Sequence, residues 1–179
     1  MTTNIKPPRN DPANTRETDT RDIDPRVTPA YLAFDTDIHI LGSRKPKTLV
    51  EADHIIRAGI PAELAEGIAA LPCLQNDQHF LTVFGIQRST YRSYLQAGIC
   101  LSKKSSSRIW SFATILGRLE NALDSRDAAQ YWLITANDRI SGKFPLDLLS
   151  TSAGTKCVEE CIDDIENEKI RNHAFPADP

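Results

Sequence analysis

A short polar segment, residues 87–93, carries the side chains best suited to contact nucleic acid. It reads QRSTYRS and offers amide, guanidinium and hydroxyl groups in close succession. Guanidinium groups bind phosphates or the O6 and N7 atoms of guanine, and amides pair with adenine in the major groove. The spacing leaves open whether Arg88 or Arg92 reads a base. The candidate DNA-contacting residues here are Gln87, Arg88, Ser89, Thr90, Arg92 and Ser93.

An apolar stretch and a glycine precede this polar segment, which is the order expected of a helix-turn-helix. Residues 80–95 read FLTVFGIQRSTYRSYL. Two helices that cross steeply need a tight turn, and Gly85 tolerates the left-handed backbone conformation there. We expect Leu81, Ile86 and Leu95 to hold the two helices together. A helical hairpin used only for packing is the alternative interpretation.

Charge is distributed unevenly along the chain, although the net charge is only -3. Residues 78–119 contain no Asp or Glu but six Lys or Arg, among them Lys103 and Lys104, whereas residues 120–179 contain twelve acids and six bases. Basic segments bind phosphates, and acidic ones favour basic protein surfaces. We expect Lys103 and Lys104 to lie in a loop and contact DNA phosphates. Two ordinary solvated faces are the alternative.

Catalytic and metal-binding patterns are absent from the sequence. The histidines, at positions 39, 54, 79 and 173, are scattered, and no nucleophile elbow or phosphate loop is present. The four cysteines form no CxxC pair and have no histidine at zinc-ligand spacing. We therefore expect no enzyme activity, no metal and no cofactor. Cys157 and Cys161 are interpreted as small buried hydrophobic residues, with a redox or metal role as the alternative.

Apolar residues recur at helical spacing from residue 48 onward, and no alternating strand pattern is longer than four residues. The fold class predicted is all-α. Residues 1–47 hold six of the eleven prolines and few apolar residues, and they are expected to form a flexible tail. The predicted helices cover 49–58, 61–71, 77–84, about 87–96, about 106–123, 126–134, 146–149, and a last segment that starts at Thr151 or Ser152.

The C-terminal part of the chain carries the most specific sequence motifs. Residues 128–133 read AAQYWL, residues 141–151 read SGKFPLDLLST, and Gly154 and Val158-Glu159 follow. This order of motifs resembles the toxin-binding domain of the Xre/MbcA/ParS antitoxin family. Its pattern is A-x-x-W-L, a loop that ends in G-x-x-P-L-D-L-L, a Thr, and G-x-x-x-V-E before a last helix. The similarity extends over roughly residues 50–170, because the family's linking helix also follows a helix-turn-helix.

The resemblance implies a biological role and two partners. It implies an antitoxin that covers the active-site entrance of a RES-type, NAD-consuming toxin, forms a homodimer and represses its own promoter or operator DNA. The apolar stripe of the long helix, Ile109 to Leu123, is the expected dimer contact. Family members usually end soon after the last helix, with a Gly-containing turn and a Phe, whereas residues 167–175 here are longer and lack Gly. Candidate toxin-binding residues are Asn137, Asp138, Arg139, Lys143, Glu159, Glu160, Asp163 and Glu166.

The expected organisation has five parts. They are the tail 1–47, a helix-turn-helix domain 48–100, a linking helix 101–123, a toxin-binding domain 124–170 and a C-terminal tail 171–179. Without a signal peptide or an apolar run long enough for a membrane helix, we expect a cytoplasmic location and no membrane partner. Two alternatives are a stand-alone helix-turn-helix transcription regulator with a dimerising C-terminal domain, and a toxin binder without DNA binding.

Overall fold

The computed structural model describes residue 46 and residues 48–174, with side chains to residue 172, and these residues form an all-α fold. The predicted fold class is confirmed. The predicted N-terminal tail lies outside the described residues except for Pro46, and so do residues 175–179. Within the described part of the chain, no helix is long and apolar enough to cross a membrane.

Short helices joined by tight turns make up the first half of the described chain. Thr48 caps the first of them by accepting a hydrogen bond from the Glu51 amide, as its spacing predicts. The segment predicted as one helix over 61–71 instead starts as a 3₁₀ turn, in which the Leu64 amide donates to the Pro61 carbonyl. The elements are α1 (Leu49–Ala58), η2 (Ala62–Ala65), α2 (Glu66–Ala69), η3 (Pro72–Leu74), α3 (Asp77–Phe84) and α4 (Arg88–Ala97).

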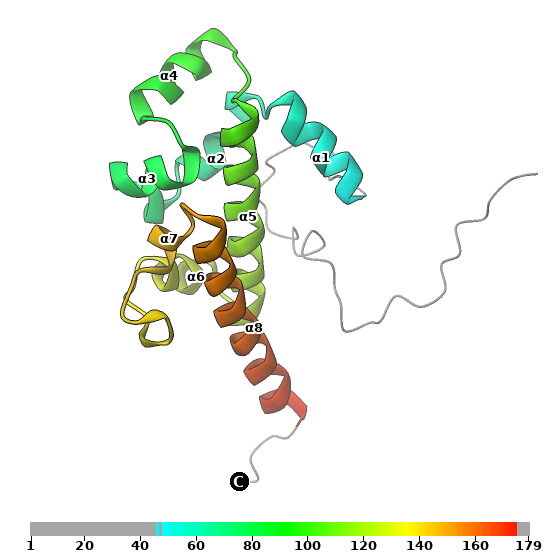
Figure 1. The fold of residues 1–179 in the computed structure, drawn as a ribbon, viewed down its shortest axis with the longest axis vertical. Coiled ribbons are helices and arrows are strands. Elements are labelled where there is room, and N and C mark those ends of the chain that lie inside the picture. Colours follow the sequence, from blue (N-terminus) through cyan, green and yellow to red (C-terminus); the bar gives the residue numbers. More distant parts are fainter. Residues whose placement is uncertain (1–45, 47, 175–179) are drawn as a thin grey trace, which may run out of the picture.

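The longest of the buried helices, α5 (Lys103–Leu123), runs through the middle of the molecule. It begins three residues before the predicted start, because Ser102 caps it by accepting a hydrogen bond from the Ser105 amide. Lys103 and Lys104 therefore lie in its first turn, and the prediction that they lie in a loop is wrong. In Figure 1, α1 lies on one side of its first half, and α2, α3 and α4 lie on the other.

Four elements follow α5 in the chain. Ser125 caps the first of them by accepting from the Ala128 amide, and Pro145 occupies the first turn of the third. The last helix continues past the predicted boundary at residue 170. The elements are α6 (Arg126–Leu133), η4 (Asp138–Ile140), α7 (Pro145–Leu148) and α8 (Ser152–Ala174).

One hydrophobic core joins both halves of the described chain. Ile109, Phe112, Leu116 and Leu119 of α5 are at most 1% exposed and pack against residues from both halves. This stripe is the surface expected to form a dimer contact, and that expectation is wrong because the stripe is already buried within one chain. The two halves are thus packed on a shared helix.

Close approach of α7 and α8 depends on a small residue. A Cβ atom placed on Gly154 would lie 2.2 Å from the Leu148 carbonyl oxygen, far inside van der Waals contact. The hydroxyl of Thr151 accepts a hydrogen bond from the Gly154 amide, so it caps the start of α8. Gly154 therefore allows α8 to pack against the end of α7.

Candidate functional site

A short turn, residues 85–87, joins α3 to α4. Gly85 ends α3 in the left-handed conformation, with a φ of 68°, and Gln87 is the N-terminal cap residue of α4. The rings of Phe80 and Phe84 are stacked 4.1 Å apart, and Tyr91 of α4 meets Phe84 edge-on at 5.0 Å. These aromatic contacts fix the angle between the two helices.

The residues predicted to hold the two helices together are only partly the right ones. Ile86 and Leu95 are half-buried against the core, as expected. Leu81 is 37% exposed and is not among the residues that pack against the core. Tyr91 takes part instead: its hydroxyl donates to the Ala62 carbonyl at 2.9 Å, and burial raises its pKa to about 12.

Arg88 does not lie on the outward face of α4. Its guanidinium lies 4.2 Å from the centre of the Phe80 ring. Its Nη2 atom donates to the Leu74 carbonyl at 2.5 Å, and its Nε atom donates to Asp77 at 3.2 Å. With only 20% of the side chain exposed, Arg88 ties the start of α4 to η3 and α3, and its donors point into the protein. This placement departs from the expected role in base reading.

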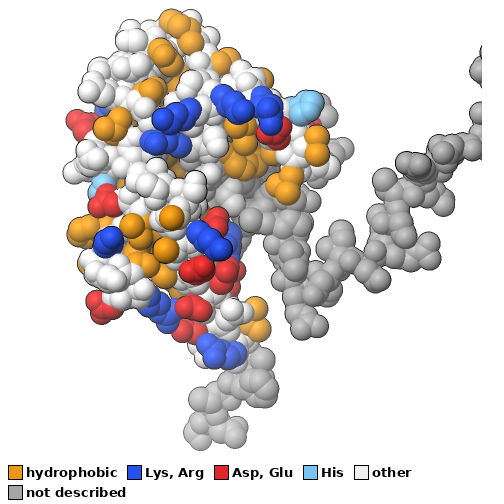
Figure 2. Space-filling model, viewed as in Figure 1, with side chains coloured by type: hydrophobic (Ala, Val, Ile, Leu, Met, Phe, Trp, Pro, Cys, Tyr) orange, Lys and Arg blue, Asp and Glu red, His pale blue; other side chains and the backbone are white. Residues whose placement is uncertain are grey.

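The other predicted DNA-contacting residues lie on or near the surface. Thr90 is half-buried. The exposed ones are Gln87, Ser89, Arg92 and Ser93 on and before α4, and Lys103 and Lys104 at the start of α5. Arg92 is thus the one exposed cation of α4. Figure 2 shows Lys and Arg side chains in both halves of the face in view, and in the lower half they lie beside Asp and Glu. The outward face of α4 is polar and carries no acid.

Ion pairs on several sides hold α8 in place, among them the pair of Lys169 with Asp124. Arg118 of α5 binds Asp163 at 2.5 Å and Glu166 at 2.7 Å, and only 16% of its side chain is exposed. On another side of α8, Arg139 binds Glu168 at 2.7 Å and Asp164 at 3.4 Å. Asp163 and Glu166 were expected to face a toxin, but their carboxylates are engaged by Arg118.

The segment between α6 and α7 forms a closed loop, which we call the 135–144 loop. Asn137 and Lys143 are joined by an isolated antiparallel bridge, in which the Asn137 amide donates to the Lys143 carbonyl at 3.0 Å. The Asn137 side chain also accepts from the Arg139 amide at 3.0 Å. These hydrogen bonds stiffen the loop, and Arg139 fastens it to α8.

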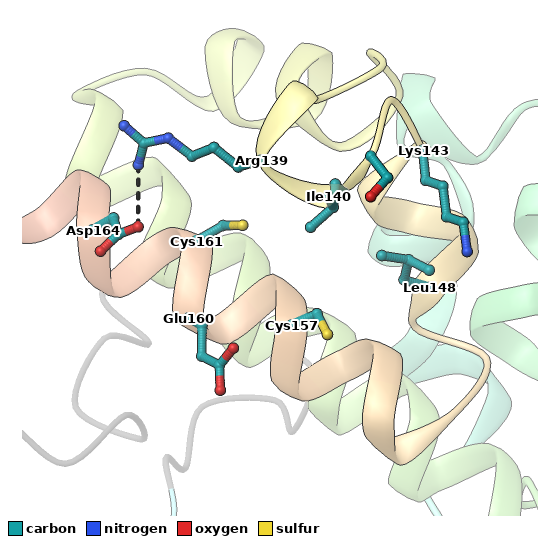
Figure 3. Close-up of a pocket in the computed structure, with 9 residues that line it drawn as sticks. Arg139, Ile140, Lys143, Leu148, Cys157, Glu160, Cys161 and Asp164 are labelled. Atoms are coloured by element: carbon teal, nitrogen blue, oxygen red, sulfur yellow. Dashed lines mark hydrogen bonds and ion pairs between the residues drawn. The ribbon is translucent and has the colours of Figure 1, made fainter.

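Two open grooves flank the 135–144 loop. The first has a volume of about 640 Å³, lies between the loop and α8, and is lined by Arg139, Ile140, Ser141, Lys143, Leu148, Cys157, Glu160, Cys161 and Asp164 (Figure 3). The second, of about 660 Å³, lies between the loop and α6, where Tyr131 and Trp132 contribute to it. Arg139 lines both grooves. Tyr131 is 68% exposed and Phe144 is 45% exposed.

The structure brings most of the predicted toxin-binding residues together around these grooves. Asn137, Asp138, Arg139, Lys143 and Glu160 each line at least one of them. Glu159 is exposed on α8 but lines neither. Cys157 is exposed, so its interpretation as a buried hydrophobic residue is wrong, whereas Cys161 is buried at 6% exposure.

Sequence reasoning missed the exposed aromatic residues of this region. Tyr131 is two residues from both Ala129 and Leu133, which are fully buried, so helical spacing would have placed it on the outer face of α6. Phe144 precedes Pro145 at the end of the loop, outside any helix, so helical spacing could not predict its exposure. Exposed aromatic side chains next to a charged loop are typical of protein-binding surfaces.

Comparison with known proteins gives a family match that covers this region. Residues 118–167 match the family model of the Antitoxin Xre/MbcA/ParS C-terminal toxin-binding domain. No curated protein sequence matches the chain. The matched segment begins at Arg118 and includes α6, the 135–144 loop, α7 and most of α8. The resemblance predicted from the motifs is confirmed for this segment, and residues 118–167 are therefore similar to the toxin-binding domain of this antitoxin family.

Proposed function

We propose that this chain is the antitoxin of a type II toxin–antitoxin pair, which neutralises a RES-type, NAD-consuming toxin by covering its active site and represses its own operon by binding DNA. The observation that carries the proposal is the antitoxin-domain match over residues 118–167. The RES type and the NAD chemistry of the partner rest on the motif resemblance described above.

The proposed toxin contact is the 135–144 loop with its two grooves. Tyr131 and Phe144 would supply apolar anchors, since aromatic and Arg side chains contribute most to protein interfaces. Asp138, Lys143, Glu159 and Glu160 are exposed and would supply a polar rim. Asn137 and Arg139 would shape the loop, and Asp163 and Glu166 would act indirectly, by fixing α8 through Arg118.

The proposed DNA contact is the exposed face of α4 with the first turn of α5. Gln87, Ser89, Thr90, Arg92 and Ser93 would face the groove, and Lys103 and Lys104 would lie against phosphates. In this proposal Arg88 does not contact DNA but orients α4. A homodimer on a two-fold operator would use a surface other than the apolar stripe of α5, because that stripe is buried in the core.

Purified proteins test this proposal. The full-length chain should co-purify with the product of the neighbouring gene and suppress its NAD consumption at equimolar ratio. If the chain binds the DNA upstream of its own gene but not the neighbouring gene's product, the chain is a stand-alone transcription regulator and not an antitoxin. If the chain binds the neighbouring gene's product but not that DNA, the chain is a toxin-binding protein that does not regulate its own operon.

A further inference from the structure

An arginine from α5 covers the turn between α3 and α4. Arg108 lies in the second turn of α5 and is half-buried. Its Nη1 atom donates to the Thr82 carbonyl of α3 at 3.2 Å. Its Cδ and Nη1 atoms each lie 3.3 Å from the position that a Cβ atom would take on Gly85, which ends α3. A side chain from a neighbouring helix therefore rests directly on the glycine of this turn.

Only part of the Arg108 guanidinium is used within the protein. An arginine carries N–H donors on Nε, Nη1 and Nη2, and in Arg108 the Thr82 carbonyl accepts from Nη1. The Nε and Nη2 atoms have no hydrogen-bond partner, and the group makes no ion pair, among the described residues. Arg88 and Arg118 differ, because each donates from Nε and Nη2 to other parts of the chain. Arg108 is thus anchored at one nitrogen with its other donors unused.

The surroundings of Arg108 favour an anion. Lys104 is exposed one turn earlier on the same face of α5, and it makes no ion pair with a described residue. Gln87 makes no side-chain capping hydrogen bond, and the first turn of α4 contains no acid, so no carboxylate of α4 offsets the positive end of that helix. Asp77, an acid close to the start of α4, is paired with Arg88. The charge at this turn is therefore complementary to a phosphate.

We propose that Arg108 binds a phosphate of duplex DNA beside the turn between α3 and α4. The inference rests on the proposed DNA contact and adds to it a residue from the second turn of α5. The Thr82 carbonyl holds the guanidinium, while Nε and Nη2 donate side by side to phosphate oxygens, the paired geometry for which a guanidinium is suited. Because Arg108 is already anchored, it loses little side-chain freedom on binding.

A phosphate contact at this turn has a different effect from a contact made by α4 itself. Phosphate contacts position a protein on the duplex, whereas base contacts give sequence preference. Arg108 lies across Gly85, just before α4 begins, so its contact fixes the start of α4 against the DNA backbone. Arg92 is exposed on α4 and makes no hydrogen bond with a described residue, which suits contact with a base edge. Loss of Arg108 should therefore weaken binding to every DNA sequence alike.

The alternative is that Arg108 only stabilises the fold. Basic side chains near the end of a helix often bind its last carbonyls, as Arg108 binds that of Thr82. In that case removing Arg108 lowers the free energy of unfolding and loosens the turn, but the number of phosphates neutralised by the protein stays the same. The salt dependence of DNA binding separates the two roles, because it counts the phosphates that are neutralised.

The test measures the affinity of the full-length chain for duplex DNA over a KCl series, by fluorescence anisotropy. The probes are the DNA upstream of its own gene and a scrambled duplex of the same length. Arg108→Gln should weaken binding to both duplexes about tenfold, as expected for a charged hydrogen bond. The slope of log affinity against log salt should become shallower by about 0.9, the value for one phosphate contact.

Two further variants act as controls. Arg108→Lys keeps the charge, so it should retain the wild-type slope. Lys156→Gln removes an exposed charge of α8 that makes no ion pair with a described residue, and it should change neither the affinity nor the slope. An Arg108→Gln protein that melts at a lower temperature but keeps the wild-type slope would overturn the proposal, because a purely structural role predicts that combination.

A second measurement decides the question if Arg108→Gln does not fold. The Nε–H signal of Arg108 in the NMR spectrum of the wild-type chain is identified by its absence from Arg108→Lys. It should shift when the scrambled duplex is added at low salt, and a signal that stays in place would refute the phosphate contact. If the wild-type chain binds neither duplex, the DNA-binding part of the proposed function fails, and this inference fails with it. A wild-type chain that binds DNA, beside an Arg108→Gln protein of unchanged slope, refutes the inference alone.

Discussion

The guanidinium of Arg118 on α5 binds the carboxylate of Glu166 on α8 through two parallel hydrogen bonds, with N–O distances of 3.1 and 2.7 Å. Asp163, one turn earlier on α8, accepts a third hydrogen bond from the same group. Bidentate pairing of this kind is geometrically specific as well as favourable. It sets the position of α8 on α5 and thereby the position of the groove beside the 135–144 loop.

Replacing Arg118 by Met should loosen this attachment. The change leaves two carboxylates on α8 facing each other without a cation, and we expect the free energy of unfolding to fall by about 1 kcal/mol, because Asp163 and Glu166 are both partly exposed. Chemical denaturation measures this loss. Arg57→Met is the control, since Arg57 pairs with Asp53 on an open surface and should cost little. Equal losses in the two variants would contradict the structural role of Arg118.

Arg88 and Arg92, four residues apart on α4, should separate stability from DNA binding. Arg88→Met removes hydrogen bonds to Leu74 and Asp77 and the contact with the Phe80 ring, so it should lower the free energy of unfolding by about 1–2 kcal/mol. Arg92→Met should leave stability unchanged and weaken binding to the DNA upstream of the chain's own frame by roughly 1–3 kcal/mol.

Denaturation and DNA titration over a salt series measure the two effects. Wild-type affinity should fall steeply with salt, and Arg92→Met should reduce that slope. An Arg92 variant that unfolds more easily, or binds DNA as wild type does, would count against the exposed face of α4 as the reading surface.

Gly154 should not tolerate a larger side chain. Gly154→Ala would put a Cβ atom 2.2 Å from the Leu148 carbonyl oxygen, so α7 and α8 must separate. Such overpacking costs roughly 1–3 kcal/mol, which the melting temperature would report. Gly67→Ala on α2 is the control: no atom lies within 4 Å of its Cβ position, and Ala favours helix, so it should be neutral or slightly stabilising. Two variants that melt alike would disprove the close contact.

The fastening of the 135–144 loop should depend on pH. The hydrogen bond from Arg139 lowers the pKa of Glu168 below its ordinary value of 4.5. A carboxylate with a lowered pKa in the folded state stabilises that state above the ordinary pKa, and the effect is lost as the pH falls through the lowered pKa. At pH 6, Glu168→Gln should therefore speed hydrogen exchange in residues 138–143.

That difference between Glu168→Gln and wild type should shrink as the pH falls below the lowered pKa of Glu168, where the wild-type carboxylate is also neutral. Glu159→Gln, an exposed acid of α8 that lines neither groove, is the control and should not change exchange in the loop. A difference independent of pH would show that the Arg139–Glu168 pair does not hold the loop.

Local sequence signals predicted the helices well, and tertiary contacts account for what they missed. Thr48, Asn76 and Ser125 cap helices by accepting hydrogen bonds from amides of the first turn, which is a local interaction. Arg88 was expected to face DNA because the spacing of residues along α4 gives no information on contacts with other elements. In the structure, Arg88 contacts the Leu74 carbonyl and the Phe80 ring, which belong to η3 and α3.

The candidate partner-binding site was predictable to a similar degree. The motifs located the 135–144 loop and its exposed charges. The engagement of Asp163 and Glu166 by Arg118 could not be predicted, because Arg118 lies 45 and 48 positions away in the chain. The same holds for the sulfur-lined groove, which forms only when the loop packs beside α8.

A growth assay tests the central claim most directly. The neighbouring gene is expressed alone, with the full-length chain, and with a Tyr131→Ala/Phe144→Ala variant, while Leu81→Ala, which changes an exposed apolar residue on α3, serves as the control. The neighbour's product should arrest growth, the full-length chain and the control should restore it, and the double variant should fail to do so. A neighbour that is harmless alone, or a double variant that rescues growth as well as the full-length chain, would contradict the account.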